Sequence, residues 1–429
     1  MIKNVLFEQK QEREWLLAGE LVEREGLVAA RAILESPVAK VIVGPRRAGK
    51  SVFAHLLLKG SSSAYVNLDD ERLIANVAST DELLKALHDV YGDFHTLFLD
   101  EIQNIPQWEL LVNRLLRGSC NVVITGSNAN LLSAELATAL TGRHAAIEVL
   151  PFSFREYLVA KKIPVNVEGP STPAGDGLML NIAGEYLRNG GYPEVVLGKV
   201  DPANYLSTLV DSILLKDVIR RYRIRQVELL HTMAMLLTAG ISQEYSLNSL
   251  ARATGAASVT TLQSYLGHLH DTWLFLELRR FSFKLKEQAK APKKAYLVDN
   301  GIFSSRAFRF SPDMGRLLEN AVFVELMRRG FNPARFDLYF YRTQQGREVD
   351  FFTRRSAVGE TLIQVSYDLS SPKTLDRELK ALVTASDETG VKDLKLITWD
   401  TEGERELDGK TISLIPAWKW MLEKRELST

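Results

Sequence analysis

The first third of the chain alternates short apolar runs with segments of helical spacing. The apolar runs cover residues 39–43, 64–68, 96–99, 121–124 and 145–150, and several of them end in polar or acidic residues. Continuous apolar runs of this length are typical of strands that are buried on both faces of a parallel sheet. The pattern therefore predicts a five-stranded parallel α/β core, in which the carboxyl ends of the strands meet at one edge.

Beyond residue 151 the pattern changes twice. Residues 163–178 hold three prolines and three glycines and predict an irregular segment, and helical spacing returns at 178–188 and 205–222. Shorter helices are predicted from residue 226 onward, and an α/β alternation returns over the last hundred-odd residues. The helices are predicted at 227–237, 246–255, 258–273, 315–329 and 373–385, and the strands at 275–281, 294–299, 338–342, 348–353, 362–367 and 394–399.

The sequence Gly-Pro-Arg-Arg-Ala-Gly-Lys-Ser lies between the first strand and the first helix of the α/β core. It matches G-x-x-x-x-G-K-[ST] at every fixed position, in the strand-to-helix context that a phosphate-binding loop requires. Glycines let the backbone turn its N–H groups inward, and the start of the helix adds a positive end. Lys50 is expected to contact the β and γ phosphates of ATP, and Ser51 to take one position on Mg²⁺. The residues predicted to hold the nucleotide are Gly44, Pro45, Arg46, Arg47, Ala48, Gly49, Lys50, Ser51 and Val52.

Polar residues end the third and the fourth strand of this core. Asp100 and Glu101 follow the third strand, and Thr125, Ser127 and Asn128 lie at the end of the fourth. Because the carboxyl ends of parallel strands border the ligand crevice, Asp100 is predicted to hold Mg²⁺ through water, and Glu101 to polarise the attacking water. Any of the three polar residues could bind the γ phosphate or this water, and the sequence does not decide which.

Composition limits the classes of partner. Lys plus Arg and Asp plus Glu both number 53, so no overall field draws the chain to nucleic acid or to anionic membranes, and such contacts require local patches. The single cysteine, Cys120, excludes an internal disulfide and a cysteine-based metal site. No apolar run approaches the ~18 residues of a membrane span, and the first residues lack a signal-peptide core. A cytoplasmic protein without a membrane partner is the expectation.

Taken together, these motifs resemble those of the AAA-type P-loop ATPases. The chain is similar, more narrowly, to bacterial and archaeal AAA-domain proteins that share a C-terminal region of uncertain function. The stretches that carry the resemblance run along nearly the whole chain and read GPRRAGKS, LFLDEIQ, VVITGSN, LTGR, PFSFREYL and GGYPEVV. The resemblance implies ATP hydrolysis with Mg²⁺ and assembly into a homo-oligomeric ring, such as a hexamer.

The resemblance also assigns roles to two residues outside the loop. Arg143, just before the fifth strand, is where the family's arginine finger would fall, which acts on the nucleotide of a neighbouring subunit. An arginine that binds carbonyl groups at a helix end is the alternative. Pro193 matches a Gly-x-Pro element that contacts the nucleotide from a helical lid in some relatives. Its alternative is a glycine cap of a helix followed by a proline.

Residues 225–310 resemble a winged helix-turn-helix, with the strands at 275–281 and 294–299 as its wing. The helix that begins near Ser258 would then enter a major groove of DNA. Residues 279–294 hold seven basic residues against one acid, Glu287, which favours contacts with phosphates. A subdomain that packs against the ATPase core and never touches DNA is the alternative. The residues predicted to contact DNA are Arg280, Lys284, Lys286, Lys293 and Lys294.

The last region resembles the core of restriction-endonuclease-like nucleases. Glu319 on the leading helix, Asp350 on one strand and Gln364 on the next stand at the metal-binding positions of that pattern. Gln364 replaces an acid and Ser366 replaces a lysine, so the cation would have one carboxylate fewer and the phosphorane would lack a positive charge. The sequence predicts a degenerate site that binds or scaffolds rather than cuts, with Lys373 as a base that could have replaced the lysine.

The predicted architecture has four parts. They are a P-loop AAA-type core with N-terminal helices at 1–155, a helical lid at 156–224, a winged helix-turn-helix at 225–310 and a C-terminal α/β nuclease-like domain at 311–429. The predicted function is ATP binding and hydrolysis by an oligomer that acts on DNA, with Glu101, Lys50 and Arg143 as catalytic residues. A nucleotide-controlled DNA-binding switch with slow turnover and an ATP-dependent nuclease are the alternatives.

Overall fold

A computed structural model describes residues 1–76, 80–127, 140, 142–165, 172–306, 313–355 and 358–424 of the chain. These residues form two compact units, Met1–Pro151 and Phe152–Thr429. The first unit ends close to the predicted end of the ATPase core at residue 155, and the second takes in the three regions that follow. The division of the second unit into three domains remains a prediction. Within the described ranges, no helix combines the length and the apolar character needed to cross a membrane.

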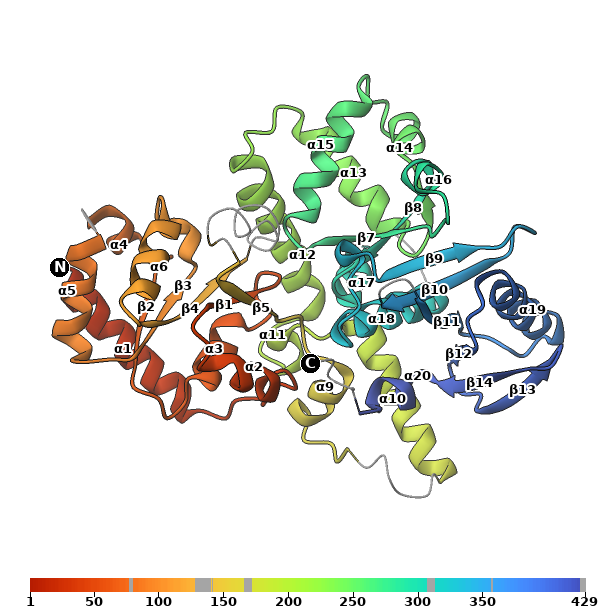
Figure 1. The fold of residues 1–429 in the computed structure, drawn as a ribbon, viewed down its shortest axis with the longest axis horizontal. Coiled ribbons are helices and arrows are strands. Elements are labelled where there is room, and N and C mark those ends of the chain that lie inside the picture. Colours follow the sequence, from red (N-terminus) through yellow and green to blue (C-terminus); the bar gives the residue numbers. More distant parts are fainter. Residues whose placement is uncertain are drawn as a thin grey trace. The chain divides into compact units, whose positions relative to one another are not determined.

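The first unit is built on a five-stranded parallel sheet in the order β2-β3-β4-β1-β5 (Figure 1). Its strands are β1 (Ala39–Val43), β2 (Ser63–Asn67), β3 (Thr96–Asp100), β4 (Asn121–Gly126) and β5 (His144–Glu148). All residues of β1 and β3 are buried, as expected of strands whose two faces are both covered. Because β4 lies between β1 and β3, the segments that follow these three strands leave the sheet side by side. The predicted parallel α/β core is confirmed.

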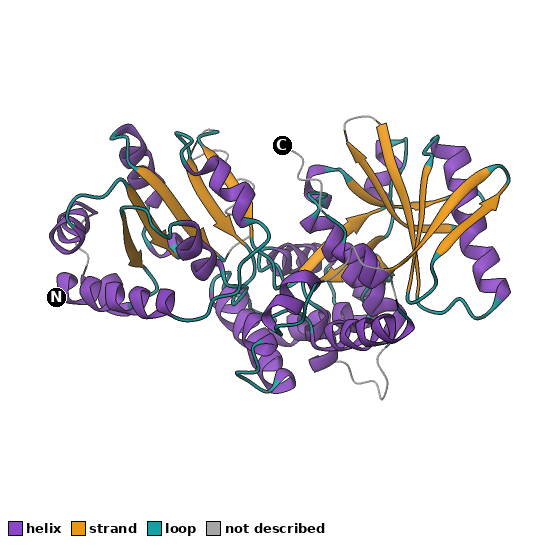
Figure 2. Cartoon of the chain, turned by 90° about the horizontal axis from the view of Figure 1, so that it is seen from below, coloured by secondary structure: helices purple, strands orange, loops and turns teal. Residues whose placement is uncertain are grey.

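Helices flank the strands of this sheet (Figure 2). In the described part of the unit they are α1 (Ile2–Ala18), α2 (Leu27–Leu34), α3 (Lys50–Leu57), α4 (Glu71–Asn76), α5 (Thr80–Tyr91) and α6 (Trp108–Arg117), with a 3-10 turn at Ile102–Asn104. Phe53 of α3 packs with Ile42, Phe98 and Val123 of the strands in one apolar cluster. Asn128, one of the three polar residues predicted at the end of the fourth strand, lies outside the described residues.

The second unit begins with helices and a small antiparallel sheet. The helices are α9 (Phe154–Ala160), α10 (Pro173–Asn189), α11 (Pro193–Val196), α12 (Pro202–Ile213), α13 (Val227–Ala239), α14 (Leu247–Thr254), α15 (Val259–His270), α16 (Leu285–Lys290) and α17 (Asn300–Arg306), with a π-helical turn at Leu214–Arg220. The strands β6 (Glu244–Tyr245), β7 (Phe275–Arg279) and β8 (Lys293–Leu297) pair in the order β6-β8-β7. Along the chain, α13, α14 and α15 are the last three helices before β7, which pairs antiparallel with β8.

A six-stranded sheet forms the rest of this unit, in the order β13-β14-β12-β11-β10-β9. Its elements are α18 (Met314–Arg328), a 3-10 turn at Pro333–Arg335, β9 (Leu338–Arg342), β10 (Glu348–Arg355), β11 (Val358–Ser366), α19 (Pro372–Thr389), β12 (Asp393–Thr398), β13 (Gly403–Leu407), β14 (Lys410–Pro416) and α20 (Ala417–Leu422). β9, β10 and β11 are antiparallel neighbours, while β11, β12 and β14 run parallel. Leu382 of α19 packs with Phe352 and Leu396 in the core of this sheet.

Several elements of the second unit begin or end at other residues than predicted, or were not predicted. α10 begins at Pro173, so the predicted irregular segment is wrong from this residue onward. The Thr172 hydroxyl accepts a hydrogen bond from the Gly175 N–H at 3.1 Å, and proline suits the first position of a helix. β8 ends at Leu297 rather than at residue 299. β13, β14 and α20 have no counterpart among the predicted elements.

Candidate functional site

The loop between β1 and α3 has a conformation that its glycines permit. Gly44 has a φ of +147°, and a Cβ atom there would lie 2.1 Å from the Val149 carbonyl oxygen, so a larger residue does not fit. Gly49 has a φ of +91° and precedes the first residue of α3. Lys50 is 5% exposed, and its Nζ donates a hydrogen bond to the Pro45 carbonyl oxygen at 2.9 Å. The amine of Lys50 therefore contacts the backbone near the start of the loop.

Asp100 ends β3 and is 3% exposed. Its Oδ1 accepts hydrogen bonds from the Ser51 hydroxyl, at 3.0 Å, and from the Thr125 hydroxyl. Burial raises the pKa of Asp100, and these two hydrogen bonds oppose part of that rise. A carboxylate oxygen and a hydroxyl of α3 thus lie close together beside the loop. Oxygen ligands of this kind suit Mg²⁺, which binds proteins through one or two carboxylates and completes its shell with phosphate and water oxygens.

Glu101 follows in a left-handed backbone conformation, with φ 53° and ψ 51°. Its N–H donates to the Thr125 hydroxyl oxygen at 3.0 Å, and its carboxylate accepts from the Ser127 hydroxyl at 3.4 Å. Among residues other than glycine this conformation is uncommon and occurs often at functional sites. The two adjacent carboxylates therefore have different partners: the Thr125 hydroxyl donates to Asp100, and the Ser127 hydroxyl donates to Glu101.

Two further residues contact this site although no motif contains them. The Tyr65 hydroxyl on β2 lies 3.4 Å from the second carboxylate oxygen of Asp100. Arg24, in the segment before α2, is 8% exposed and donates to the carbonyl oxygens of Ala48 at 3.0 Å and Leu150 at 2.6 Å. It therefore links the phosphate-binding loop to the segment after β5. No sequence signal marks Arg24, because a single arginine in an amphipathic segment has no distinguishing pattern.

Arg143 lies in the first unit and Pro193 in the second. Arg143 is exposed and directly precedes β5, where its carbonyl oxygen accepts the Ala39 N–H at 3.0 Å. Pro193 belongs to the second unit and is the first residue of α11. It follows Gly190, which caps α10 with a φ of +75°. A glycine cap followed by a proline is the predicted alternative to a nucleotide contact.

The five residues predicted to contact DNA differ in exposure. Lys284 and Lys286 are exposed, and Arg280 is half-buried. Lys284 and Lys293 each form an ion pair with a glutamate, at 3.0 and 2.7 Å. Lys294 is only 1% exposed, so its assignment to a DNA-contacting surface is wrong. Successive residues of a strand point to opposite faces, and β8 turns Lys294 into the interior.

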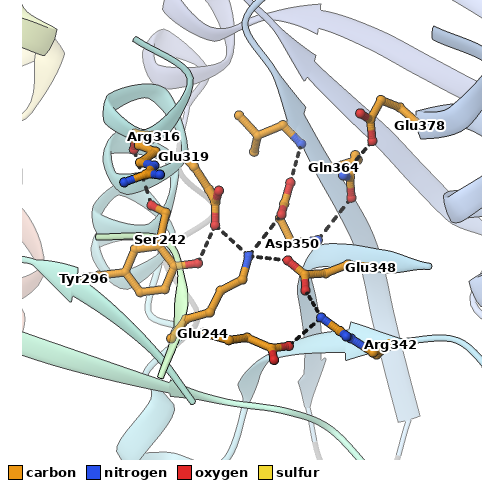
Figure 3. A network of polar contacts seen from close by, with 12 residues as sticks. Ser242, Glu244, Tyr296, Arg316, Glu319, Arg342, Glu348, Asp350, Gln364 and Glu378 are labelled. Carbon is orange, nitrogen blue, oxygen red and sulfur yellow. Dashed lines mark hydrogen bonds and ion pairs between the residues drawn. The ribbon is translucent and has the colours of Figure 1, made fainter. Parts of the chain in front are cut away.

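Three carboxylates surround the ammonium group of Lys294. Its Nζ lies 2.8 Å from Glu348, 2.9 Å from Glu319 and 3.2 Å from Asp350, and Figure 3 shows these acids converging from α18 and β10. The Tyr296 hydroxyl donates to Glu319 at 2.7 Å. Burial alone would lower the pKa of Lys294, but the carboxylates outweigh it and raise that pKa well above its ordinary value. A positive charge from the chain itself therefore occupies the centre of this acidic cluster.

Gln364 faces away from this centre (Figure 3). Its side-chain oxygen accepts the Asp350 N–H at 3.1 Å, and its amide nitrogen donates to Glu378 at 2.8 Å. Lys373, the base suggested by the sequence, is exposed at the start of α19. The structure instead brings in Lys294, 56 residues before Asp350. In the part of the chain that the structure describes, no group of three or more His, Cys, Asp or Glu side chains is arranged to hold a metal ion.

Comparison with protein families identifies the class of this chain. A family model described as an AAA domain matches residues 36–158, and two domains of unknown function match residues 182–313 (DUF8612) and 314–420 (DUF4143). An uncharacterized protein of Methanocaldococcus jannaschii is 34% identical over 407 residues, which are 89% of this chain and 88% of the relative. One of Haemophilus influenzae is 31% identical over 77% of this chain and 82% of the relative. The chain belongs to the family of AAA-domain proteins with a C-terminal DUF4143 domain.

Solved structures show more distant likenesses. The chain is similar to the Walker-type ATPase of Pyrococcus abyssi, with 17% identity and a TM-score of 0.40, over 66% of this chain and 95% of that one. It is also similar to the Aeropyrum pernix ORC1 protein, solved in complex with DNA, with 14% identity and a TM-score of 0.31, over 72% of this chain and 95% of that one.

Proposed function

We propose that the chain binds ATP together with Mg²⁺ and hydrolyses it. One observation carries this proposal: the hydroxyls of Ser51 and Thr125 meet on the same carboxylate oxygen of Asp100, beside the buried amine of Lys50. Three separate elements, α3, β3 and β4, supply these groups together with the loop. A phosphate-binding loop next to a buried acid and a hydroxyl suits a nucleoside triphosphate with its metal ion.

In this proposal different residues bind the phosphates, hold Mg²⁺ and orient the attacking water. Lys50 neutralises charge on the β and γ phosphates, and the N–H groups of the loop and of the α3 N-terminus bind the same phosphates. Ser51 and Asp100 would hold Mg²⁺, which when bound neutralises phosphate charge. Glu101, whose backbone is bound to Thr125, orients the attacking water toward the γ phosphate.

Two substitutions separate nucleotide binding from hydrolysis. Lys50→Ala should abolish ATP binding or turnover, because it removes the charge that neutralises the phosphates. Glu101→Gln should keep ATP bound but lower turnover by ~10²–10⁴-fold, because it preserves shape and loses the group that orients water. Glu109→Gln, on α6, is the matched control. Binding of a fluorescent ATP analogue and release of phosphate measure the two steps, and normal turnover of Lys50→Ala would overturn the proposal.

We further propose that the second unit brings this ATPase to DNA and that the protein works as an oligomer. The succession of α13, α14 and α15 followed by the antiparallel pair β7-β8 supports a winged helix-turn-helix. The proposed DNA contacts are now Arg280, Lys284, Lys286 and Lys293. Lys294 is no longer among them. Turnover measured with and without DNA, together with the molar mass in solution, tests this. DNA-stimulated turnover by an oligomer supports it, whereas a monomer that stays loaded with ATP supports a slow switch.

The region after residue 313 is proposed to bind or scaffold DNA and not to cut it. Its order of α18, three antiparallel strands, α19 and a parallel strand supports a nuclease-like domain. The ammonium group of Lys294 opposes cleavage, because a divalent cation would have to displace a charge that is already paired with three carboxylates. Incubation with branched, single-stranded and duplex DNA in Mg²⁺ and in Mn²⁺ tests this. Cutting that disappears in Asp350→Ala would overturn it.

A further inference from the structure

Three large apolar side chains of the second unit are exposed near the end of β7. Phe283 is 72% exposed and Leu285 is 80% exposed, on the segment that runs from β7 into α16. Phe336, directly after the 3-10 turn that precedes β9, is 51% exposed. Single exposed apolar residues are common, but exposed apolar residues that gather on one surface often mark a binding site.

These residues line two adjoining hollows in the surface. One has a volume of ≈ 430 Å³ and is lined by Phe281, Ser282, Phe283, Leu285, Gln288, Phe336, Tyr339 and Arg354. The other has a volume of ≈ 450 Å³ and is lined by Arg335, Phe336, Asp337, Tyr339, Arg354 and Arg355. Phe336, Tyr339 and Arg354 line both hollows, so the hollows are neighbours. We call this surface, formed by the residues of both hollows, the stacking surface.

Guanidinium groups lie close to the rings of the stacking surface. Arg354 lies 5.3 Å from the ring centre of Phe281, and Arg279 lies 5.2 Å from that of Phe336. An acid, Asp337, lines the second hollow, and its carboxylate accepts a backbone N–H within the same segment. The cations that line or flank the hollows are Arg279, Arg335, Arg354 and Arg355. Arg279 also pairs with Glu277 at 3.5 Å, and Arg355 with Glu360 at 3.6 Å. The surface therefore combines flat apolar rings with guanidinium groups.

We propose that the stacking surface binds single-stranded nucleic acid. Phe283 and Phe336 offer exposed rings to the flat faces of unpaired bases, and the arginines contact the phosphates between those bases. The bases of a duplex are stacked on one another, so they do not offer their faces to such rings. This inference rests on the proposed DNA-directed function and deepens it, because it names the form of nucleic acid that the second unit prefers.

The chemistry of this surface favours nucleic acid over an acidic peptide. An acidic peptide would satisfy the arginines but would leave the exposed parts of the Phe283 and Phe336 rings without a flat partner. A nucleotide carries both groups on each repeat, one charge and one aromatic face, so a single strand can occupy the arginines and the rings together. Lys284 and Lys286, in the same exposed segment as Phe283, extend the positive charge.

Equilibrium binding of labelled oligonucleotides to the full chain tests the proposal. The probes are oligothymidylate and oligouridylate of ~16 nucleotides, about one binding site, and a duplex of the same length. The wild-type chain should bind the single strands more tightly than the duplex. Phe283→Ala and Phe336→Ala should each weaken single-strand binding by roughly 5- to 150-fold. Tighter binding of oligothymidylate identifies the ligand as DNA, and tighter binding of oligouridylate identifies it as RNA.

Matched variants separate stacking from folding and from charge. Phe7→Ala removes a phenylalanine of similar exposure, 54%, from the first unit and should leave binding unchanged. Phe283→Trp and Phe336→Trp should retain binding, since any aromatic ring can stack. Arg354→Gln should reduce the slope of log K against log salt by ~0.7 for each phosphate that the side chain no longer neutralises. Thermal unfolding of each variant shows whether the fold is kept.

Two results would overturn this inference. One is that the wild-type chain does not bind single strands. The other is that Phe283→Ala and Phe336→Ala bind single strands as tightly as the wild type does. If the wild-type chain and both phenylalanine variants bind the duplex equally well, the DNA-directed function stands and the stacking surface is rejected. The assay contains no ATP, so a failure of the proposed hydrolysis would leave its outcome unaffected.

Discussion

Thr125 connects the two acids of the candidate nucleotide site at the scale of single residues. Its side chain is fully buried, donates a hydrogen bond to Asp100 and accepts the Glu101 N–H at 3.0 Å. Thr125→Val keeps the shape but leaves both groups without this partner, at a cost of ~1–3 kcal/mol in stability. We expect a lower Tm and slower ATP turnover, because Glu101 loses the bond that fixes its backbone. Thr125→Ser should restore both, and unchanged turnover in the valine variant would contradict the role.

Asp299 gives the second unit a defined dependence of stability on pH. Its carboxylate oxygens accept the N–H groups of Gly191 at 2.6 Å and Gly301 at 2.9 Å. Burial nevertheless raises the pKa of Asp299 from 3.8 to about 6. Between these values the folded chain binds more protons at this group than the unfolded chain does. Its contribution to the free energy of unfolding therefore falls as the pH rises from about 4 to about 6, by up to ~3 kcal/mol.

Asp299→Asn should flatten that part of the pH profile. Thermal unfolding of the wild type and the variant, recorded from about pH 4 to pH 7, gives the difference in slope. Asp400→Asn, at an exposed aspartate of the same unit, is the control and should leave the profile unchanged. The same slope for the wild type and Asp299→Asn would show that this carboxyl does not titrate in the window.

At the scale of elements, the turn between α10 and α11 requires two glycines. A Cβ on Gly190 would lie 1.8 Å from a carboxylate oxygen of Asp299, and one on Gly191 would lie 2.2 Å from the Phe152 carbonyl oxygen. The carboxylate cannot retreat without losing its bonds to two backbone N–H groups. The two glycines of the Gly-Gly-Tyr-Pro sequence are thus explained by packing within the second unit.

Gly190→Ala should therefore destabilise the second unit strongly. We expect a loss of ~3 kcal/mol or more, because the steric overlap adds to the strain of a positive φ. Gly198→Ala is the matched control, since Gly198 has a similar φ of +69° but no atom within 4 Å of an added Cβ. It should cost only ~1–2 kcal/mol. Denaturant unfolding compares the two, and equal losses would contradict the packing argument.

At the scale of the whole molecule, substitution of Arg143 tests whether one subunit contributes to the nucleotide site of its neighbour. The side chain is exposed, so it is able to reach a neighbouring subunit in an oligomer. Arg143→Ala should lower turnover by up to ~10³–10⁵-fold with little loss of ATP affinity. Mixing it with Glu101→Gln should restore part of the turnover, because each variant supplies the group that the other lacks.

The control for this mixture is Lys50→Ala combined with Glu101→Gln. Both of these variants carry Arg143, but neither has a complete site of its own, so their mixture should stay inactive. Phosphate release across a range of mixing ratios measures the effect. A mixture of Arg143→Ala and Glu101→Gln without recovery would mean that Arg143 acts within its own chain or supports structure alone.

The sequence determined the parts of this protein that depend on neighbouring residues. The loop from Gly44 to Ser51 needs its glycines and its lysine at fixed spacing, and a buried strand needs a continuous apolar run, so both are visible in a short window. The strand order then brings Asp100 and Thr125 together, 25 residues apart in the chain. Their meeting could be expected because both end parallel strands, but the division of partners between Asp100 and Glu101 could not.

Only the tertiary structure decided which side chains from distant segments meet. Lys293 and Lys294 are identical in type and adjacent, yet Lys293 is half-buried and pairs with one acid, Glu277, whereas Lys294 is buried among three. A count of charges cannot separate them, because burial depends on which strands pair with β8 and on what packs against each face. Arg24 and Phe336 were missed for the same reason, since hydrogen bonding and exposure are set by atoms that the chain brings together only when it folds.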